Sequence, residues 1–113
     1  MDCIFCKIVA GEIPSDIVYQ DEELFAFRDI NPVAPTHILI IPKKHIPSCV
    51  EMTEADTSLA GKMVLTAAKL AKSEGVSESG YRLAINCGEQ GGQLVPHLHI
   101  HLIGGRQFAA ELG

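Results

Sequence analysis

The sequence predicts an α+β fold, in which a five-stranded antiparallel sheet packs against one long helix. The first observation is a set of five short apolar segments joined by short connections. The second is a single stretch between Thr53 and Gly75 in which apolar residues recur at three- and four-residue spacing, as in an amphipathic helix. Because the chain has 113 residues, we expect residues 1–113 to form one domain.

The first two predicted strands form a hairpin, and a third strand follows them. Ile17 to Gln20 and Leu24 to Ile30 read as strands on either side of the polar turn Asp21 to Glu23. Asn31 to Pro35 should be an irregular loop, because each of its prolines lacks an N–H donor and biases the preceding residue away from helix. Thr36 to Pro42 is expected to be a central strand.

The predicted helix carries signals at both ends. Thr53 is a good N-cap, and acidic residues follow it in the first turn, where they suit the helix dipole. Gly75 is a plausible stop. We interpret the apolar stripe of this helix as a core-facing surface, formed by Leu59, Met63, Ala67, Leu70 and Ala71.

Two further strands complete the sheet. Tyr81 to Asn86 is the predicted fourth strand, and Cys87 to Gly92 is a glycine-rich loop. The fifth strand lies in the stretch from Gln93 to Gly105, where aliphatic residues alternate with His97, His99 and His101. Period-two alternation is typical of a strand buried on one face. All three imidazoles should therefore project from the same face of the sheet.

These three histidines are the strongest functional signal in the chain. Successive side chains on one face of a strand lie about 7 Å apart, so three imidazoles can surround one small anionic group or take part in one metal site. A purely structural role is the plain alternative, although histidine adds little to a core and costs free energy when it is buried unpaired. Imidazole is the commonest metal ligand, so a three-histidine metal site and phosphate chemistry both stay open.

Composition narrows the class of protein. Apolar residues make up 47% of the chain, which is enough to fill a core. No stretch approaches the roughly 20 continuous apolar residues of a membrane span, and no basic apolar segment opens the chain, so we expect a cytosolic protein that does not engage a membrane. A net charge of −5 argues against nonspecific nucleic-acid binding. It does not exclude a small nucleotide, whose phosphates can be held by local donors.

A pair of cysteines, Cys3 and Cys6, stands near the start of the chain. At this spacing both residues lie on one helical turn or one tight turn, so both thiolates can reach one ion. The pair is half of a zinc site in one interpretation and two small buried hydrophobic residues in the other.

Several blocks of the chain together resemble the histidine triad (HIT) superfamily. His97 to Ile103 follow its pattern of His, apolar, His, apolar, His and two apolar residues. Asp29 to Pro32, Ala34 to His37 and Ile41 to His45 are similar to further signatures, in an order and spacing that fit from about Cys3 to Gln107. Gly104 to Gln107 resembles the Hint branch of nucleoside phosphoramidases more than the dinucleoside polyphosphate hydrolases.

This resemblance implies a short N-terminal helix beside the sheet and a homodimer in which two sheets join. It also implies a purine-nucleotide hydrolase or transferase without an organic cofactor, which releases AMP from a phosphoramidate through a covalent nucleotidyl-histidine. His99 would be the nucleophile, His101 would donate to the phosphate oxygens, and His37 matches a further histidine of the phosphate region. Other matching positions are the nucleoside pocket of Phe27, Asp29 and Ile30, and the phosphate surroundings of Asn86, Gly92 and Gln93.

The resemblance extends to a metal. Some superfamily members, and the related galactose-1-phosphate uridylyltransferase, bind structural zinc through a Cys-x-x-Cys pair, a histidine after the central strand and the first triad histidine. Two sulfurs and two nitrogens close a tetrahedral site and leave no position for substrate. The four matching residues here are Cys3, Cys6, His45 and His97, whereas Cys49 and Cys87 are expected to be free thiols.

The chain departs from the Hint pattern at two places that bear on the leaving group. Leu94 stands where many members have a serine, and Phe108 to Gly113 replaces a common Trp-Pro-Pro-Gly ending. Two alternative functions therefore remain: a dinucleoside polyphosphate hydrolase, and a purine-nucleotide-binding interaction module with weak catalysis.

Overall fold

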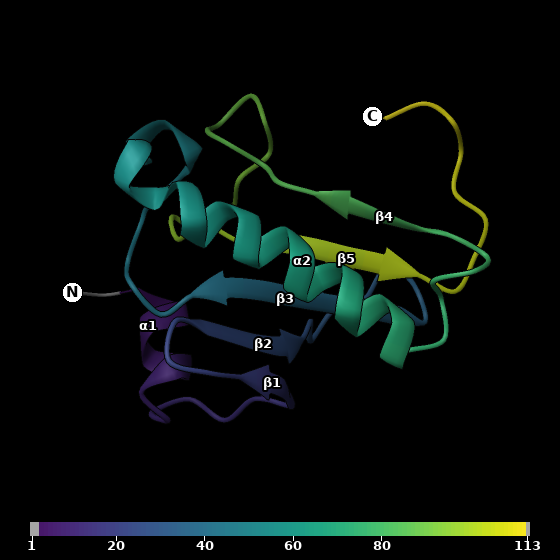
Figure 1. Ribbon diagram of the computed structural model, residues 1–113, viewed down its shortest axis with the longest axis horizontal. Coiled ribbons are helices and arrows are strands. Elements are labelled where there is room, and N and C mark those ends of the chain that lie inside the picture. Colours follow the sequence, from purple (N-terminus) through teal and green to yellow (C-terminus); the bar gives the residue numbers. More distant parts are fainter. Residues whose placement is uncertain (1–2, 113) are drawn as a thin grey trace.

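The computed structural model describes residues 3–112 as a five-stranded antiparallel sheet with helices on its two faces (Figure 1). The predicted α+β class is confirmed. The strands lie in the order β1-β2-β3-β5-β4, and Met1, Asp2 and Gly113 of the predicted domain lie outside the described residues. The elements are α1 (Ile4–Val9), β1 (Ile17–Gln20), β2 (Leu24–Arg28), β3 (Thr36–Pro42), the 3-10 turns η1 (Cys49–Glu51) and η2 (Glu54–Asp56), α2 (Thr57–Ser73), β4 (Tyr81–Ala84) and β5 (Ile100–Gly104).

The central strand β3 is buried along its whole length because both of its faces are covered. Its partners are β2, with Leu24 opposite Pro42, and β5, with Thr36 opposite Gly104. On one face, α2 runs across the sheet (Figure 1). The predicted apolar stripe of α2 packs there against Leu98 and against alternate strand residues, which are Leu24, Ala26, Ile38, Ile40, Ile100 and Leu102.

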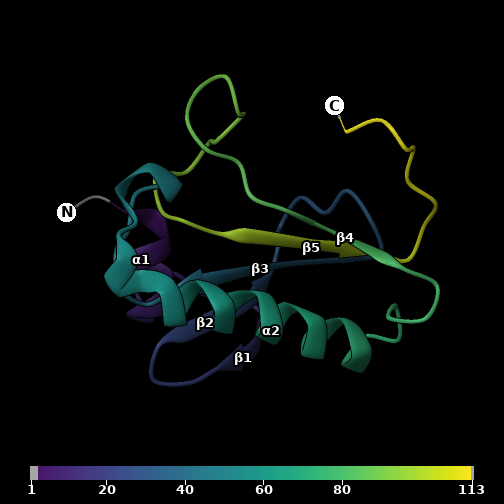
Figure 2. The same ribbon diagram turned by 45° about the horizontal axis from the view of Figure 1, so that its top comes forward.

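The opposite face carries a smaller apolar cluster under α1. The alternation of strand residues turns Phe25, Phe27, Leu39 and Ile41 to this face, where they meet Cys3, Phe5 and Ile8. Helix α1 has only six residues and lies near one end of the sheet (Figure 2). The histidine rings occupy this same face, because Leu98, Ile100 and Leu102 point toward α2. The predicted common face of the three imidazoles is confirmed.

The histidine strand is shorter than predicted. β5 begins only at Ile100, so His97 and His99 precede the ladder. The register pairs Ile40 with Ile100 and therefore brings Pro42 opposite Leu98, where a proline has no N–H for a ladder bond. The Leu98 N–H instead donates to the Ile46 carbonyl at 2.7 Å. The chain at His97 is thus tied to the loop that follows β3.

Three other predicted boundaries are also wrong by a few residues. Thr53 caps the 3-10 turn η2, and its own N–H donates to the Asp56 carboxylate at 2.9 Å, so α2 begins at Thr57. β2 ends at Arg28 because Asp29 starts a turn, in which its Oδ1 accepts from the Asn31 N–H at 2.8 Å. β4 ends at Ala84, and residues 85–96 form a loop that stands out from the sheet (Figure 2).

Within residues 3–112, no helix combines the length and apolar character that crossing a membrane requires.

Candidate functional site

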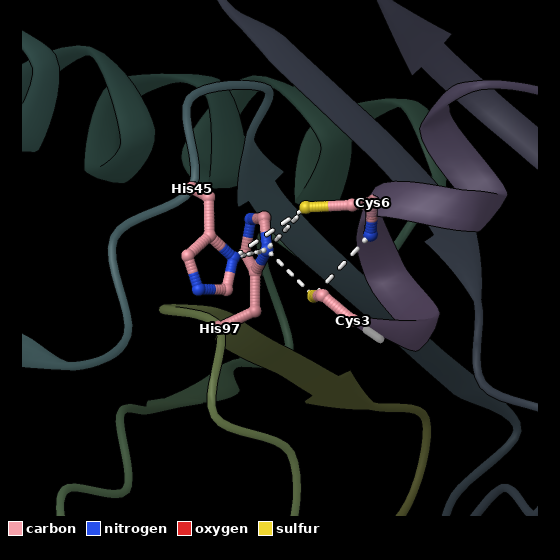
Figure 3. Close-up of side chains that lie close together, drawn as sticks. All are labelled: Cys3, Cys6, His45 and His97. Atoms are coloured by element: carbon pink, nitrogen blue, oxygen red, sulfur yellow. Dashed lines mark hydrogen bonds between the residues drawn. The ribbon is translucent and has the colours of Figure 1, made fainter. Parts of the chain in front are cut away.

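A group of four side chains, here called the cysteine cluster, consists of Cys3, Cys6, His45 and His97 (Figure 3). Cys3 is the N-cap of α1, Cys6 lies within that helix, His45 comes from the loop after β3, and His97 comes from the segment before β5. Their four ligand atoms all lie within 4.8 Å of one another. The structure therefore brings together all four residues that the sequence suggests as metal ligands.

The geometry of the cysteine cluster fits a tetrahedral metal ion. Zinc bonds to sulfur and nitrogen are about 2.3 Å and 2.0–2.1 Å long, so ligand atoms around the ion lie roughly 3.3–3.8 Å apart. His97 Nδ1 lies 3.3 Å from Cys3 Sγ, 3.7 Å from Cys6 Sγ and 3.2 Å from His45 Nδ1. Cys6 Sγ lies 3.4 Å from His45 Nδ1. This group could hold a metal ion.

The protonation of His97 also suits a metal ligand. Its Nε2 lies 2.8 Å from the Pro42 carbonyl, which can only accept, so Nε2 carries the proton and Nδ1 presents a lone pair to the cluster. Burial lowers the pKa of His97 and keeps the ring neutral. Burial and the neighbouring Cys3 raise the pKa of the Cys6 thiol, so a metal that binds the thiolate must displace a proton.

His99 is oriented by the backbone of His97. Its Nδ1 lies 2.6 Å from the His97 carbonyl, so Nδ1 must be the donor and Nε2 carries the lone pair. The ring is 6% exposed and lies between two aromatic neighbours. Phe5 contacts it with ring centroids 5.2 Å apart, and His101 does so at 4.9 Å. An imidazole held in this way presents a nucleophilic nitrogen in a defined direction.

A second group, here called the histidine relay, consists of Asp29, His37 and His101. The Val33 N–H donates to His37 Nδ1 at 3.1 Å, so the proton of neutral His37 sits on Nε2. Nε2 lies 3.0 Å from His101 Nδ1 and 3.4 Å from Asp29 Oδ2. His101 accepts from His37 through Nδ1 and therefore holds its own proton on Nε2.

Both histidines of the relay are neutral at ordinary pH. Burial, with the neighbouring His99 and His37, lowers the pKa of His101 to about 4. Burial also lowers the pKa of His37, against the opposing effect of Asp29. His101 Nε2 is therefore an N–H donor. Although the relay's ligand atoms are as close as those of the cysteine cluster, the N–H on His37 Nε2 occupies the position that a metal would need.

The three predicted nucleoside-pocket residues lie in different environments. Phe27 is 5% exposed and packs edge-on against Phe5 with ring centroids 5.5 Å apart. Asp29 is half-buried and already accepts from Asn31 through one carboxylate oxygen. Ile30 is 91% exposed. Of the three, only Asp29 contacts a histidine of the relay, which is His37.

The three predicted phosphate-pocket residues lie in the 85–96 loop and brace it. The Asn86 Nδ2 donates to the Gly91 carbonyl at 2.7 Å. The Gln93 amide donates to the carbonyls of Pro47 and Val95 and accepts from the Gly88 N–H, so it also ties the loop to the segment between β3 and η1. Gly92 has φ of +76°, which favours glycine. An open hollow of about 360 Å³ is lined by Gly88, Glu89, Gly92, Gln93, Leu94 and Pro96.

Reasoning from the sequence missed Phe5, whose ring packs against both His97 and His99. Its position between Cys3 and Cys6 was the available signal, since a helix that holds two ligands also carries the residues between them.

Cys49 and Cys87 form no disulfide, as predicted.

Comparison with known proteins places these features in context. The sequence profile of the HIT domain matches residues 10–108. The purine nucleoside phosphoramidase of Escherichia coli (strain K12) is 53% identical over 111 residues, which cover 98% of this chain and 93% of that protein. A HIT family hydrolase from Legionella pneumophila Philadelphia 1 superposes with a TM-score of 0.97 at 51% identity, covering 99% and 100% of the two chains. A histidine triad protein from Clostridium difficile gives a TM-score of 0.95 at 45% identity, covering 99% and 97%.

Proposed function

This chain belongs to the HIT domain family, and on that basis we propose that it is a hydrolase of purine nucleoside phosphoramidates. The proposed products are a purine nucleoside monophosphate such as AMP and a free amine. The name of the 53% identical relative from Escherichia coli supports the substrate class. One observation in the structure carries the mechanism: the Nδ1–H of His99 donates to the His97 carbonyl at 2.6 Å and leaves Nε2 free to attack phosphorus.

The reaction proceeds in two displacements at the α-phosphorus. In the first, His99 Nε2 bonds to phosphorus, the bond from phosphorus to the leaving nitrogen breaks, and the amine departs with an added proton. In the second, the oxygen of water bonds to phosphorus, water loses a proton, and the phosphorus–Nε2 bond breaks. Covalent catalysis of this kind replaces one hard displacement by two easier ones.

His101 and His37 assist His99 from the same face. The Nε2–H of His101 donates to a phosphate oxygen, on which negative charge grows in the transition state. His37 fixes the tautomer of His101, because its own Nε2–H donates to His101 Nδ1 at 3.0 Å. A neutral His101, whose pKa lies at about 4, keeps this donor across the cytosolic pH range.

The substrate occupies the open end of this face. Asp29 accepts from ribose hydroxyls through its remaining lone pairs, and Phe27 and Ile30 flank the base. Asn86, Gly92 and Gln93 surround the phosphate at the 85–96 loop. Leu94, which is 93% exposed beside that loop, can neither donate nor accept a hydrogen bond. Protonation of the leaving amine therefore falls to His101, water or the substrate itself.

The cysteine cluster binds one structural zinc ion. Its distances and its two-sulfur, two-nitrogen donor set support zinc, which prefers this tetrahedral coordination in closed sites. With Cys3, Cys6, His45 and His97 as its four ligands, the ion would have no open position for substrate. When bound, zinc supplies a fixed link between α1, the loop after β3 and the segment before β5.

The protein forms a homodimer through β4, one of the two edge strands of the sheet. β4 is an edge strand, and such edges are usually paired or covered. Apolar side chains of α2 and of the 85–96 loop are also exposed, namely Val64, Leu65 and Ile85, which are 46–57% exposed. Sedimentation of the purified protein distinguishes dimer from monomer.

A turnover assay tests the central proposal. The parent protein should release AMP from adenosine 5′-phosphoramidate faster than it cleaves diadenosine polyphosphate, and the reverse preference would favour the rival hydrolase. His99→Ala should lower the rate by several orders of magnitude, as loss of a nucleophile does, while AMP binding stays near that of the parent. Near-parent activity in His99→Ala would contradict the nucleophile assignment.

The exposed Leu94 favours a second candidate, a nucleotide-binding module with weak catalysis. Such a protein would bind AMP but show no burst of product in a single turnover.

A further inference from the structure

Phe5 joins the cysteine cluster to the imidazole of His99. It lies on α1 between the two cysteines and is 6% exposed. Its ring meets His99 edge-on, with centroids 5.2 Å apart and ring planes at 85°. It also meets His97 at 5.9 Å and 63°. The short helix that supplies two sulfurs to the cluster therefore also supplies one wall of the space that holds His99.

Helix α1 depends on contacts outside itself for its position. It spans six residues, and isolated helices shorter than about 12 residues are marginal in water. Cys3 serves as its N-cap, with its sulfur accepting from the Cys6 N–H at 3.4 Å. The remaining attachments are the cysteine cluster and the buried side chains Phe5 and Ile8. Whatever fixes the cluster therefore also fixes Phe5.

His99 needs a restraint beyond its hydrogen bond. The bond from Nδ1 to the His97 carbonyl fixes one nitrogen, but a single hydrogen bond leaves the ring free to tilt about it. Phe5 and His101 lie 5.2 Å and 4.9 Å from the ring and limit that tilt. His101 is itself aimed by the histidine relay, whereas Phe5 is aimed by α1.

We propose that Phe5 is a positioning residue. The metal-loaded cysteine cluster holds α1 in place, and Phe5, which lies on α1, in turn holds the imidazole of His99. Phe5 touches neither the reacting phosphorus nor the metal. It keeps the ring of His99 in the orientation that directs Nε2 at substrate. The effect of Phe5 on turnover rests on the proposed hydrolase function, but its effect on the ring does not, and the two can be measured separately.

The first measurement needs no substrate. Exchange of the His99 Nδ1 proton with water can be followed by nuclear magnetic resonance in the metal-loaded parent, Phe5→Leu and Phe25→Leu. Phe25 is a matched control, because it is 2% exposed in the same apolar cluster and its ring lies against Phe27. We expect exchange to be roughly tenfold faster in Phe5→Leu, since loss of an edge-on aromatic contact frees the ring, and to change less than about twofold in Phe25→Leu. Equal rates in the two variants, or an unchanged rate in Phe5→Leu, would overturn the proposal.

The second measurement compares turnover with and without metal. In loaded protein, Phe5→Leu should lower kcat for adenosine 5′-phosphoramidate roughly tenfold or more with little change in KM, because a misplaced nucleophile costs rate and leaves substrate binding intact. Removing the metal with a chelator should lower kcat of the parent but should lower kcat of Phe5→Leu little further. Loss of the metal and loss of the Phe5 ring both act on the contact between Phe5 and His99, so their effects should not add. The same fold-loss on metal removal in both proteins would overturn the coupling.

Two further provisions separate a failure of folding or of the hydrolase function from a failure of the Phe5 proposal. If Phe5→Leu does not fold, Phe5→Met replaces it in both measurements, because the unbranched, flexible methionine side chain adapts better to the space that the ring leaves. If the parent shows no turnover, the hydrolase function fails, and the proton exchange of His99 still decides whether Phe5 holds the ring.

Discussion

The cysteine cluster and the histidine relay flank His99 on the same face of the sheet, and they differ in where their protons lie. In each group the ligand atoms are within 4.8 Å of one another. In the cysteine cluster, the His97 Nε2–H donates to the Pro42 carbonyl outside the cluster, so the Nδ1 lone pair of His97 points toward the two sulfurs. In the relay, the Val33 N–H occupies His37 Nδ1, so an N–H points inward at His101 and Asp29.

This difference shows that proximity of histidines does not by itself define a metal site. In each ring, the nitrogen that faces away from the group bonds to the backbone, and this backbone partner selects the tautomer. The tautomer decides whether the other nitrogen, which faces the group, offers a lone pair or a proton. The backbone partner of His97 is a carbonyl, so His97 can act as a metal ligand. The backbone partner of His37 is an amide N–H, so His37 acts as a hydrogen-bond donor. His99 follows the pattern of His97, because its backbone partner is also a carbonyl, but its lone pair is directed at substrate.

The largest expected effect comes from breaking the cysteine cluster. Cys6→Ser should lower the metal content from about one ion per chain to nearly none, and the free energy of unfolding should fall by ~3 kcal/mol or more, because metal binding contributes directly to folding. For a domain of this size that corresponds to a drop in Tm of roughly 10 °C or more. Elemental analysis and thermal unfolding, with Cys49→Ser as the control, measure both quantities. A variant that keeps its metal would contradict the ligand assignment.

Breaking the histidine relay should affect rate and leave the metal in place. His101→Phe keeps an aromatic ring beside His99 but removes the N–H donor, so kcat should fall about 10²–10³-fold, as it does on loss of a single oxyanion donor. His101→Gln retains an amide N–H and should recover part of that loss. Steady-state kinetics together with metal analysis test the comparison. A loss of metal in His101→Phe would mean that the two groups are not independent.

A smaller effect is expected at the third member of the relay. Asp29→Ala should raise KM for ribonucleotide substrates and weaken the preference for ribose over deoxyribose, because a carboxylate acceptor for the hydroxyls is lost. The expected cost is about 1–3 kcal/mol, the penalty of leaving a hydrogen-bonding partner unpaired. Comparing kcat/KM for ribose and deoxyribose phosphoramidates measures it. An unchanged ribose preference would leave Asp29 with only its turn and its contact to His37.

The smallest expected effect is a pH dependence of stability that comes from the relay. The pKa of His101 is lowered from 6.5 to about 4, so between these values the unfolded chain binds a proton that the folded chain does not. Stability from this group is therefore complete above pH 6.5 and falls as the pH drops toward 4. Denaturant unfolding at several pH values should show a fall on the order of 1 kcal/mol more in the parent than in His101→Phe. Parallel pH profiles would contradict a buried neutral His101.

The sequence predicted the first hairpin, the central place of β3 and the common face of the three histidines, because each follows from local patterns. The late start of β5, at Ile100 and after His97 and His99, could not be predicted, because it depends on the register that brings Pro42 opposite Leu98. The cysteine cluster joins residues as far apart as Cys3 and His97, and only the family resemblance indicated that they meet. The tautomers depend on Pro42, Val33 and the His97 carbonyl, whose positions the tertiary fold decides.

The roles of the histidines depend on which nitrogen of each ring carries the proton, and one measurement reads this for all five histidines. Nitrogen-15 chemical shifts of histidine-labelled, metal-loaded protein near pH 7 distinguish protonated, lone-pair-bearing and metal-bound ring nitrogens. We predict metal-bound Nδ1 for His45 and His97, a proton on Nδ1 with a free Nε2 for His99, and a proton on Nε2 for His37 and His101. A proton on Nε2 of His99, or a metal-bound nitrogen in His37 or His101, would contradict the account.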